Sequence, residues 1–409
     1  MVVILIFSNM PLLNAFAASK NERGEYLNCA NATGTEAESG DAADTSKNEN
    51  LHELDGKIDE IISSFSEEDF KFLLDELNEI TGKERTLKET ITAFITGESG
   101  LGYATLKTYF LSRTFSLASA NYDALIYLAC LIALLAFSNI IIAKNNDNSE
   151  KSIIFYIYYP LIACLVLSLV KSAFKYAEAA LSAQTKLTEL LFPIMFSVTL
   201  IAGDFGVALI KPFTVFLGFF TGELILDFFL PLLSLAFCVL VVGNLSVKLN
   251  LNELFKTLMS VFKWSIGFIA AIYSSLITVE GLTNGTYNGV SVKILKYLSG
   301  TSVPIVGGLI SGSTDVILSA VTLVKNSIGV MSAVVIICYV GLKGVNSVAY
   351  SLSLKFLNSL LAPVTNSRIT KLINGSCEII SALAALIFLS GLMFILTVVF
   401  VIKSTGGLF

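Results

Sequence analysis

Long apolar stretches separated by short polar ones dominate the chain after about residue 122. Each approaches the roughly 20 residues that an α-helix needs to cross a bilayer. We place seven such spans at 124–143, 153–170, 190–210, 224–242, 264–282, 327–345 and 379–402. Amphipathic pieces lie between them at 171–189, 244–263 and 350–377, with charges at helical spacing that favour solvated or interfacial faces. The pattern predicts an all-α, polytopic transmembrane domain over 123–409.

The first residues have the features of a signal peptide. A short apolar run is followed by Pro11 and then by Ala15-Phe16-Ala17, an A-x-A cleavage pattern. We therefore predict a signal peptide over 1–17, which would place the next region outside the cytoplasm; a membrane anchor is the alternative. The lysines of the predicted loops do not support this orientation. Amphipathic segments lying on the membrane blur such a count, so we follow the signal peptide.

The polar region before the spans divides in two. Residues 18–65 are acidic and poor in large apolar side chains, so we predict disorder. Residues 66–122 are predicted to form an extracytoplasmic or interfacial helical region. Ser66 is placed to cap a first helix that has acids in its first turn, and a second polar helix follows. The amphipathic stripe over 101–119 fits either a core face or an interfacial helix.

The stretch 279–329 lies among the apolar spans, yet it is dense in glycine and contains isolated charges. Irregular backbone at membrane depth is tolerated only where protein or water satisfies its polar groups. Glycines also allow helices or subunits to approach closely. We therefore predict an irregular packing seam or pore-lining element. Its candidate residues are Glu280, Gly281, Gly285, Gly289, Gly300, Pro304, Gly307, Gly308, Gly312, Asp315 and Lys325.

Two questions about this stretch stay open at the level of sequence. Glu280 and Asp315, with Lys293 and Lys325 as candidate counterions, fit either a polar pathway or subunit contact, or an internal ion pair. Hydropathy does not decide whether 303–322 is a re-entrant segment or an eighth crossing. Our hypothesis is that several copies pack through the glycines around a shared polar lumen.

Three further carboxylates lie in apolar surroundings. Asp204 and Asp227 invite comparison with intramembrane aspartyl proteases, but the sequence before Asp204 lacks the first glycine of G-x-G-D. A structural carboxylate at a broken helix is the favoured interpretation. Glu223 and Asp227 are four residues apart and share a helix face, where like charges repel. They fit a cation-coupled transporter, but an interfacial face is favoured.

Composition narrows the function classes. The 409 residues are 54% hydrophobic and only 14% charged, against roughly 25% charged in soluble domains. Residues 1–122 hold 20 acidic and 10 basic side chains, and the rest hold 12 and 17, which argues against a nucleic-acid partner. His52 is the single histidine, the cysteines lie mostly in apolar spans, and no nucleotide-binding loop occurs. We expect no enzyme activity, no cofactor and no metal.

The chain from about Tyr122 to Phe409 resembles the stage III sporulation protein AE family in the order of its apolar segments. The resemblance rests on Val279, Gly281, Asn288-Gly289-Val290, Gly300, Val303-Pro304-Ile305-Val306-Gly307, Thr314-Asp315, Val324-Lys325-Asn326 and Gly329. It implies a gate-like, multi-pass subunit of the secretion-system-like apparatus that links mother cell and forespore. The implied location is the mother-cell membrane around the forespore. The implied partners are the other membrane proteins of the same operon and a forespore-anchored protein, Q.

Residues alone leave two classes of function. One is a structural or channel subunit of a membrane assembly, a homo-oligomer in contact with membrane lipid, as the interfacial amphipathic segments and the seam of glycines favour. The other is a stand-alone permease with its own solute site. Permeases often contain repeated halves, and the sequence has no convincing internal repeat, so the assembly subunit is favoured.

Overall fold

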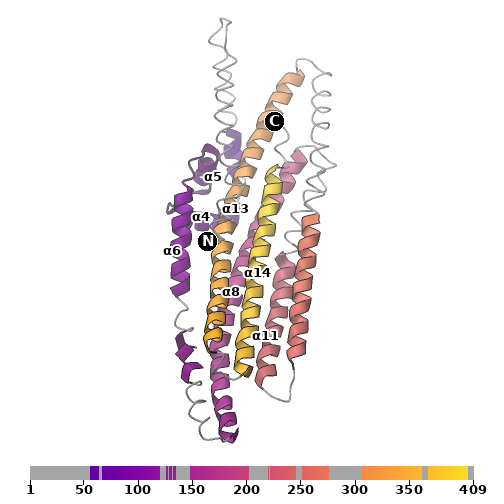
Figure 1. Ribbon diagram of the computed structural model, residues 1–409. Helices are drawn as coiled ribbons and strands as arrows, with labels where there is room; N and C mark the ends of the chain where they lie inside the picture. The colour runs from indigo at the N-terminus through magenta and orange to yellow at the C-terminus, as the bar shows by residue number, and fades with distance from the viewer. Residues whose placement is uncertain are drawn as a thin grey trace.

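A computed structural model describes residues 56–63, 67–119, 126–127, 129–130, 132–134, 148–201, 220, 222–245, 251–275, 306–361 and 367–403. Every regular element among these residues is a helix, which confirms the predicted all-α fold. The long helices run side by side in an elongated bundle (Figure 1). Five helices in the described ranges are long and apolar enough to cross a membrane. The predicted signal peptide and most of the first predicted span lie outside these ranges.

The helices fall into a small head and a long bundle. The head contains α4 (Glu67–Thr81), α5 (Leu87–Thr96) and α6 (Tyr103–Ser119). The bundle contains α8 (Asn148–Ile201), the π-helix η1 (Ile225–Phe229) that continues into α11 (Leu230–Leu245), a helix over Asn252–Ser275, α13 (Val306–Leu361) and α14 (Ser367–Lys403).

Helix α8 corrects the predicted division into spans. It is one unbroken helix of 54 residues, about 80 Å long at 1.5 Å per residue. The predicted spans 153–170 and 190–210 are therefore not separate crossings, because α8 contains the first and the described part of the second. The intervening charges at 171–189 suggested an interfacial segment. The same part of α8 also carries small side chains on its buried side: Ala173, Ala177 and Ala180.

Helix α13 corrects a second prediction. The stretch 279–329 was predicted to be irregular, but α13 is regular helix from Val306 onward, for 56 residues. Its intrahelical hydrogen bonds satisfy the backbone, so glycines at this depth do not require an irregular chain. Residues 306–322 run without a break into 327–345 and are neither a re-entrant hairpin nor a separate crossing. Residues 279–305 lie outside the described ranges.

Helices α13 and α14 pack antiparallel along most of their length. Gly329 faces Ile402 at one end, and Asn358 donates a 2.7 Å hydrogen bond to Asn374 at the other. Between them, Ser351 Oγ donates to the Cys377 carbonyl oxygen at 3.0 Å. A Cβ placed at Gly391 would lie 2.8 Å from Val340 Cγ1. These contacts fix the register of the two helices, as glycine-mediated close approach does in membrane bundles.

The head packs against the middle of α13. Phe72 of α4 meets Tyr339 edge to face, with ring centroids 5.7 Å apart. Phe110 of α6 lies against Gly341. Lys343 lies over the Tyr339 and Tyr176 rings, 5.1 and 5.4 Å from their centroids, in two cation–π contacts. Phe110 therefore packs against the protein, as the core-face interpretation of 101–119 predicts.

Local sequence explains the head itself. Thr86 and Glu89 form a capping box that begins α5, and Gly97 ends it at a φ of 79°. The prediction of disorder over 18–65 is wrong for residues 56–63, which form a helix. The reason is that Ile58 and Ile62 of that helix are buried in the head's core. The rest of 18–65 lies outside the described ranges.

Replacing Gly391 by alanine should destabilise the bundle. Val340 is buried and β-branched, so it cannot yield to the new methyl group, and overpacking of this kind costs about 1–3 kcal/mol. Gly267→Ala is the matched control, because nothing lies within 4 Å of a Cβ there and the helix gains up to about 1 kcal/mol. Unfolding midpoints in a denaturing-detergent titration measure both. A Gly391→Ala variant as stable as Gly267→Ala would contradict the close contact.

Stability of the head should depend on Glu76. Burial raises the pKa of Glu76 above its ordinary value of 4.5, although Lys343 and Arg113 nearby lower it and Asp75 adds to the rise. The folded head therefore holds this proton more tightly than the unfolded chain does. The stability that protonated Glu76 contributes is fully present below the pKa of Glu76 in the unfolded chain. It is lost as the pH rises through the pKa of Glu76 in the folded protein.

We expect Glu76→Gln to be at least as stable as the natural chain near neutral pH and to gain less stability on acidification. Thermal unfolding at pH values between about 7 and 4 measures the difference. Glu68→Gln, an exposed carboxylate of the same helix, is the control. Identical pH dependence in the Glu76→Gln variant and the natural chain would contradict the assignment.

Candidate functional site, a polar face at membrane depth

The predicted pore and packing residues fall into three groups. Outside the described ranges lie Glu280, Gly281, Gly285, Gly289, Gly300 and Pro304. On helical backbone at the start of α13, without described side chains, lie Gly307, Gly308, Gly312 and Asp315. Lys325 lies farther along α13 and is only 1% exposed. Its pairing with Asp315 stays a prediction.

The core around α13 contains further polar groups. Asn326 Oδ1 and Ser332 Oγ are buried on α13 and make no hydrogen bond to the described residues. The same holds for Asn346 Oδ1 and for Gln184 Oε1 of α8. Such atoms cost about 1–3 kcal/mol each when they lack any partner. The bundle core is therefore polar enough for buried water to bind.

Of the three predicted carboxylates, the structure describes Glu223 and Asp227. Asp204 lies outside the described ranges. Glu223 is half-buried two residues before η1, whereas Asp227 lies within η1 and is exposed. The protease and transporter hypotheses for these residues stay predictions.

The helix over Asn252–Ser275 has three distinct faces. One is buried and consists of Phe255, Met259, Phe262 and Tyr273. A second, the apolar flank, exposes Leu254, Val261, Trp264, Phe268 and Ile272. The third, the polar flank, consists of Lys256, Ser260, Lys263, Gly267 and Ser274, all of them exposed. Residues of the two flanks are often neighbours in sequence, because adjacent residues point about 100° apart around a helix.

Helix α14 extends the polar flank into a wider surface. Lys263 Nζ lies 2.6 Å from Glu378 Oε1, in an ion pair whose side chains are 62% and 42% exposed. Lys371 and Asn374 lie on the same exposed stripe of α14 as Glu378. Asn374 bonds Asn358 of α13, and the exposed Lys355 lies one turn before Asn358. We call the polar flank together with Lys355, Lys371, Asn374 and Glu378 the polar face.

The depth of the polar face in a bilayer decides which neighbours it requires. The described part of this helix begins at Asn252 and is long and apolar enough to cross a bilayer, and Lys263 lies 11 residues, about 16 Å, from that beginning. A span that begins at Asn252 places the Lys263–Glu378 pair inside the hydrocarbon core, which is about 30 Å thick. A charge there costs about 2.5–3.5 kcal/mol or more unless water or protein solvates it. The polar face therefore needs a polar neighbour.

The apolar flank has the opposite requirement. Trp264 and Phe268 stack with ring centroids 5.5 Å apart and are 69% and 54% exposed. Large exposed apolar side chains at this depth suit lipid. One helix thus separates a surface that lipid solvates from one that it cannot solvate.

Sequence reasoning missed this site. The Lys263–Glu378 pair joins residues 115 positions apart, and no local pattern predicts such a contact. A usable signal was the recurrence of small and polar residues along 256–274, on one side of an otherwise apolar helix. It was obscured because part of it lay in the segment 244–263, which was interpreted as interfacial.

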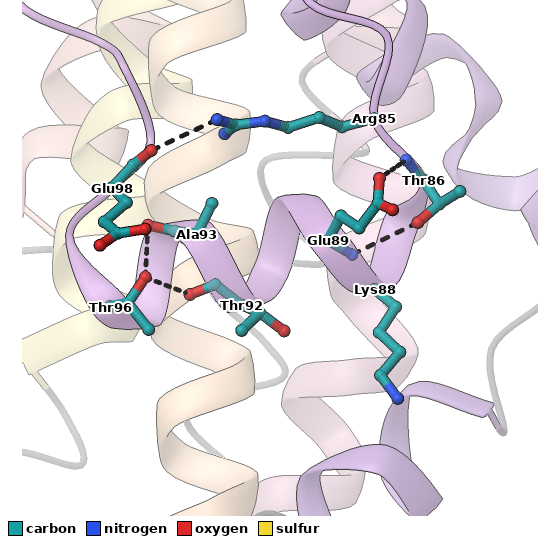
Figure 2. A pocket seen from close by; sticks show the side chains of 8 residues that line it. All are labelled: Arg85, Thr86, Lys88, Glu89, Thr92, Ala93, Thr96 and Glu98. Carbon is teal, nitrogen blue, oxygen red and sulfur yellow. Dashed lines mark hydrogen bonds between the residues drawn. The ribbon is translucent and has the colours of Figure 1, made fainter.

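A shallow pocket on the head has a simpler explanation. Figure 2 shows the side chains that line it along α5, from Arg85 to Glu98. Arg85 donates to the Glu98 carbonyl at 3.4 Å, and Lys88 pairs with Asp59 at 2.8 Å. These contacts cap and anchor α5, so the pocket follows from how the head is built. Among the described residues no group of three or more His, Cys, Asp or Glu could hold a metal ion.

Comparison with known proteins identifies the family. The chain is 21% identical over 321 residues to the stage III sporulation protein AE of Bacillus subtilis (strain 168), covering 78% of this chain and 80% of that protein. No solved structure matches the fold. The model of the stage III sporulation protein AE family matches residues 85–405, which include most of the head and the whole described bundle. The chain therefore belongs to the stage III sporulation protein AE family.

Proposed function

We propose that this protein is a non-enzymatic, gate-like subunit of the channel apparatus that connects mother cell and forespore, and that its polar face forms part of the wall of a hydrated passage. It acts in the mother-cell membrane around the forespore. Its partners are further copies of itself, the other membrane proteins of the same sporulation operon and the forespore-anchored protein Q. Family membership supports the sporulation role.

The observation that carries the gate-like role is the outward position of the Lys263–Glu378 pair on an apolar helix. A permease that works alone encloses its solute site between its own helices. Here the charged pair lies on the outside of the described bundle, where it is open to a polar neighbour such as a second chain. This arrangement favours a subunit of an assembly over a stand-alone permease.

The head supports the same placement of the membrane. The exposed acids of α4, Glu68 and Asp69 among them, require water, and α4 packs on α13 at Tyr339. The part of α13 beyond it presents apolar side chains every four residues, as a lipid-facing stripe does: Val348, Leu352, Phe356 and Leu360. The polar face reaches this same level, since its Asn374 accepts a hydrogen bond from Asn358 of α13.

Paired cysteine substitutions test whether the polar face is wet. In a chain whose native cysteines are replaced by alanine, Ser260→Cys and Gly267→Cys should react with a membrane-impermeant thiol reagent. Their neighbours Val261→Cys and Phe268→Cys should react at least about tenfold more slowly, because the reactive thiolate needs water. Labelling rates in membranes from sporulating cells measure this, with gel shifts as the readout.

The paired design distinguishes the side of the helix on which a residue lies from its depth in the membrane. Members of each pair lie at the same level of the helix, so exposure at a membrane surface would label both equally. Equal labelling within pairs, or no labelling at any of the four positions, would overturn the proposal.

Copies with Gly267→Cys should also form covalent dimers with a bifunctional thiol reagent. Exclusively monomeric products would argue against homo-oligomers around the passage.

A further inference from the structure

The polar face has an excess of positive charge. The Asn252–Ser275 helix, the last 17 residues of α13 (345–361) and α14 up to Glu378 contain five basic and two acidic side chains: Lys256, Lys263, Lys355, Arg368 and Lys371 against Glu253 and Glu378. Both acids already pair with lysines, Glu253 with Lys256 at 2.8 Å and Glu378 with Lys263 at 2.6 Å. The net charge of this region is therefore three positive charges.

The excess charge is concentrated toward one end of the bundle. Lys371 lies seven residues before Glu378 on the exposed stripe of α14, about 10 Å along the helix. Lys355 lies one turn from Asn358, which bonds Asn374 on that stripe. Both lysines are exposed and lie near the ends where α13 finishes and α14 begins, at the bottom of the view in Figure 1. They flank the approach to the neutral Lys263–Glu378 pair.

We propose that Lys355 and Lys371 form a cationic mouth to the passage, which selects small anionic solutes such as carboxylates and phosphate esters over cations. Fixed positive charge beside low-dielectric walls raises the local concentration of anions. Lysine and arginine rings confer anion preference on pores in the same way. The inference rests on the proposed function, because only a hydrated face can attract a dissolved ion.

Charged thiol reagents test the selectivity. With Gly267→Cys as the reporter, the rates of an anionic sulfonate and a cationic trimethylammonium methanethiosulfonate are each divided by their rates with a free thiol in solution. The corrected ratio should favour the anionic reagent at least about threefold. Adding Lys355→Gln and Lys371→Gln should bring the ratio close to one. Lys83→Gln, an exposed lysine of the head, is the control and should leave the ratio unchanged.

Salt provides a second measurement on a chain with all its lysines. Raising the ionic strength from about 0.05 M to 0.5 M should reduce the anion preference, because screening shortens the reach of Lys355 and Lys371. No reaction with either reagent would contradict the hydrated passage itself. Reaction without an anion preference, or a preference that survives the double lysine substitution, would overturn the cationic mouth and leave the proposed function standing.

Discussion

Charge in the middle of a membrane helix must be solvated by something other than lipid, and this constraint organises the bundle. The Lys263–Glu378 pair satisfies itself electrostatically, yet both side chains remain largely exposed. Pairing lowers the cost of burying the charges but does not make their outer surface compatible with hydrocarbon. The surface of the bundle is consequently of two kinds, and the division runs along a single helix, between Lys263 and its neighbour Trp264.

The position of the polar face depends on the packing behind it. Helices α13 and α14 are held in register by glycine contacts and by polar bridges such as Ser351 to the Cys377 carbonyl. That register places Asn358 opposite Asn374. On the same stripe of α14, one turn after Asn374, Glu378 reaches the Asn252–Ser275 helix. Tyr273 of that helix donates to the Met393 carbonyl at 2.7 Å, which fixes the part of the helix near Ser275 against α14.

Local sequence predicted the helical fold and most of the head, because these depend on patterns within about 15 residues. The first-turn acids of α4, the capping box of α5 and the stripe of α6 are all such patterns. Division into spans failed where a helix exceeds the bilayer thickness. Charges within α8 suggested a break between two crossings, although the helix continues through them because small residues bury its other side.

The candidate site was harder to predict for a related reason. Glycine and charge density drew attention to 279–329, but hydropathy measures composition and not which residues face outward. In the helix over Asn252–Ser275, Gly267 and Phe268 are adjacent in sequence and belong to different surfaces. Only tertiary packing of Phe262 and Tyr273 into the core determines which side each one takes.

Helix α13 joins the head to the polar face without a hinge. Lys343, which lies under the head, and Asn358, which bonds α14, are 15 residues apart on one continuous helix, roughly 22 Å. A stiff rod of this kind transmits a push or a twist with little loss. Any displacement of the head is thereby carried along α13 to the level of Asn358, where α13 bonds α14.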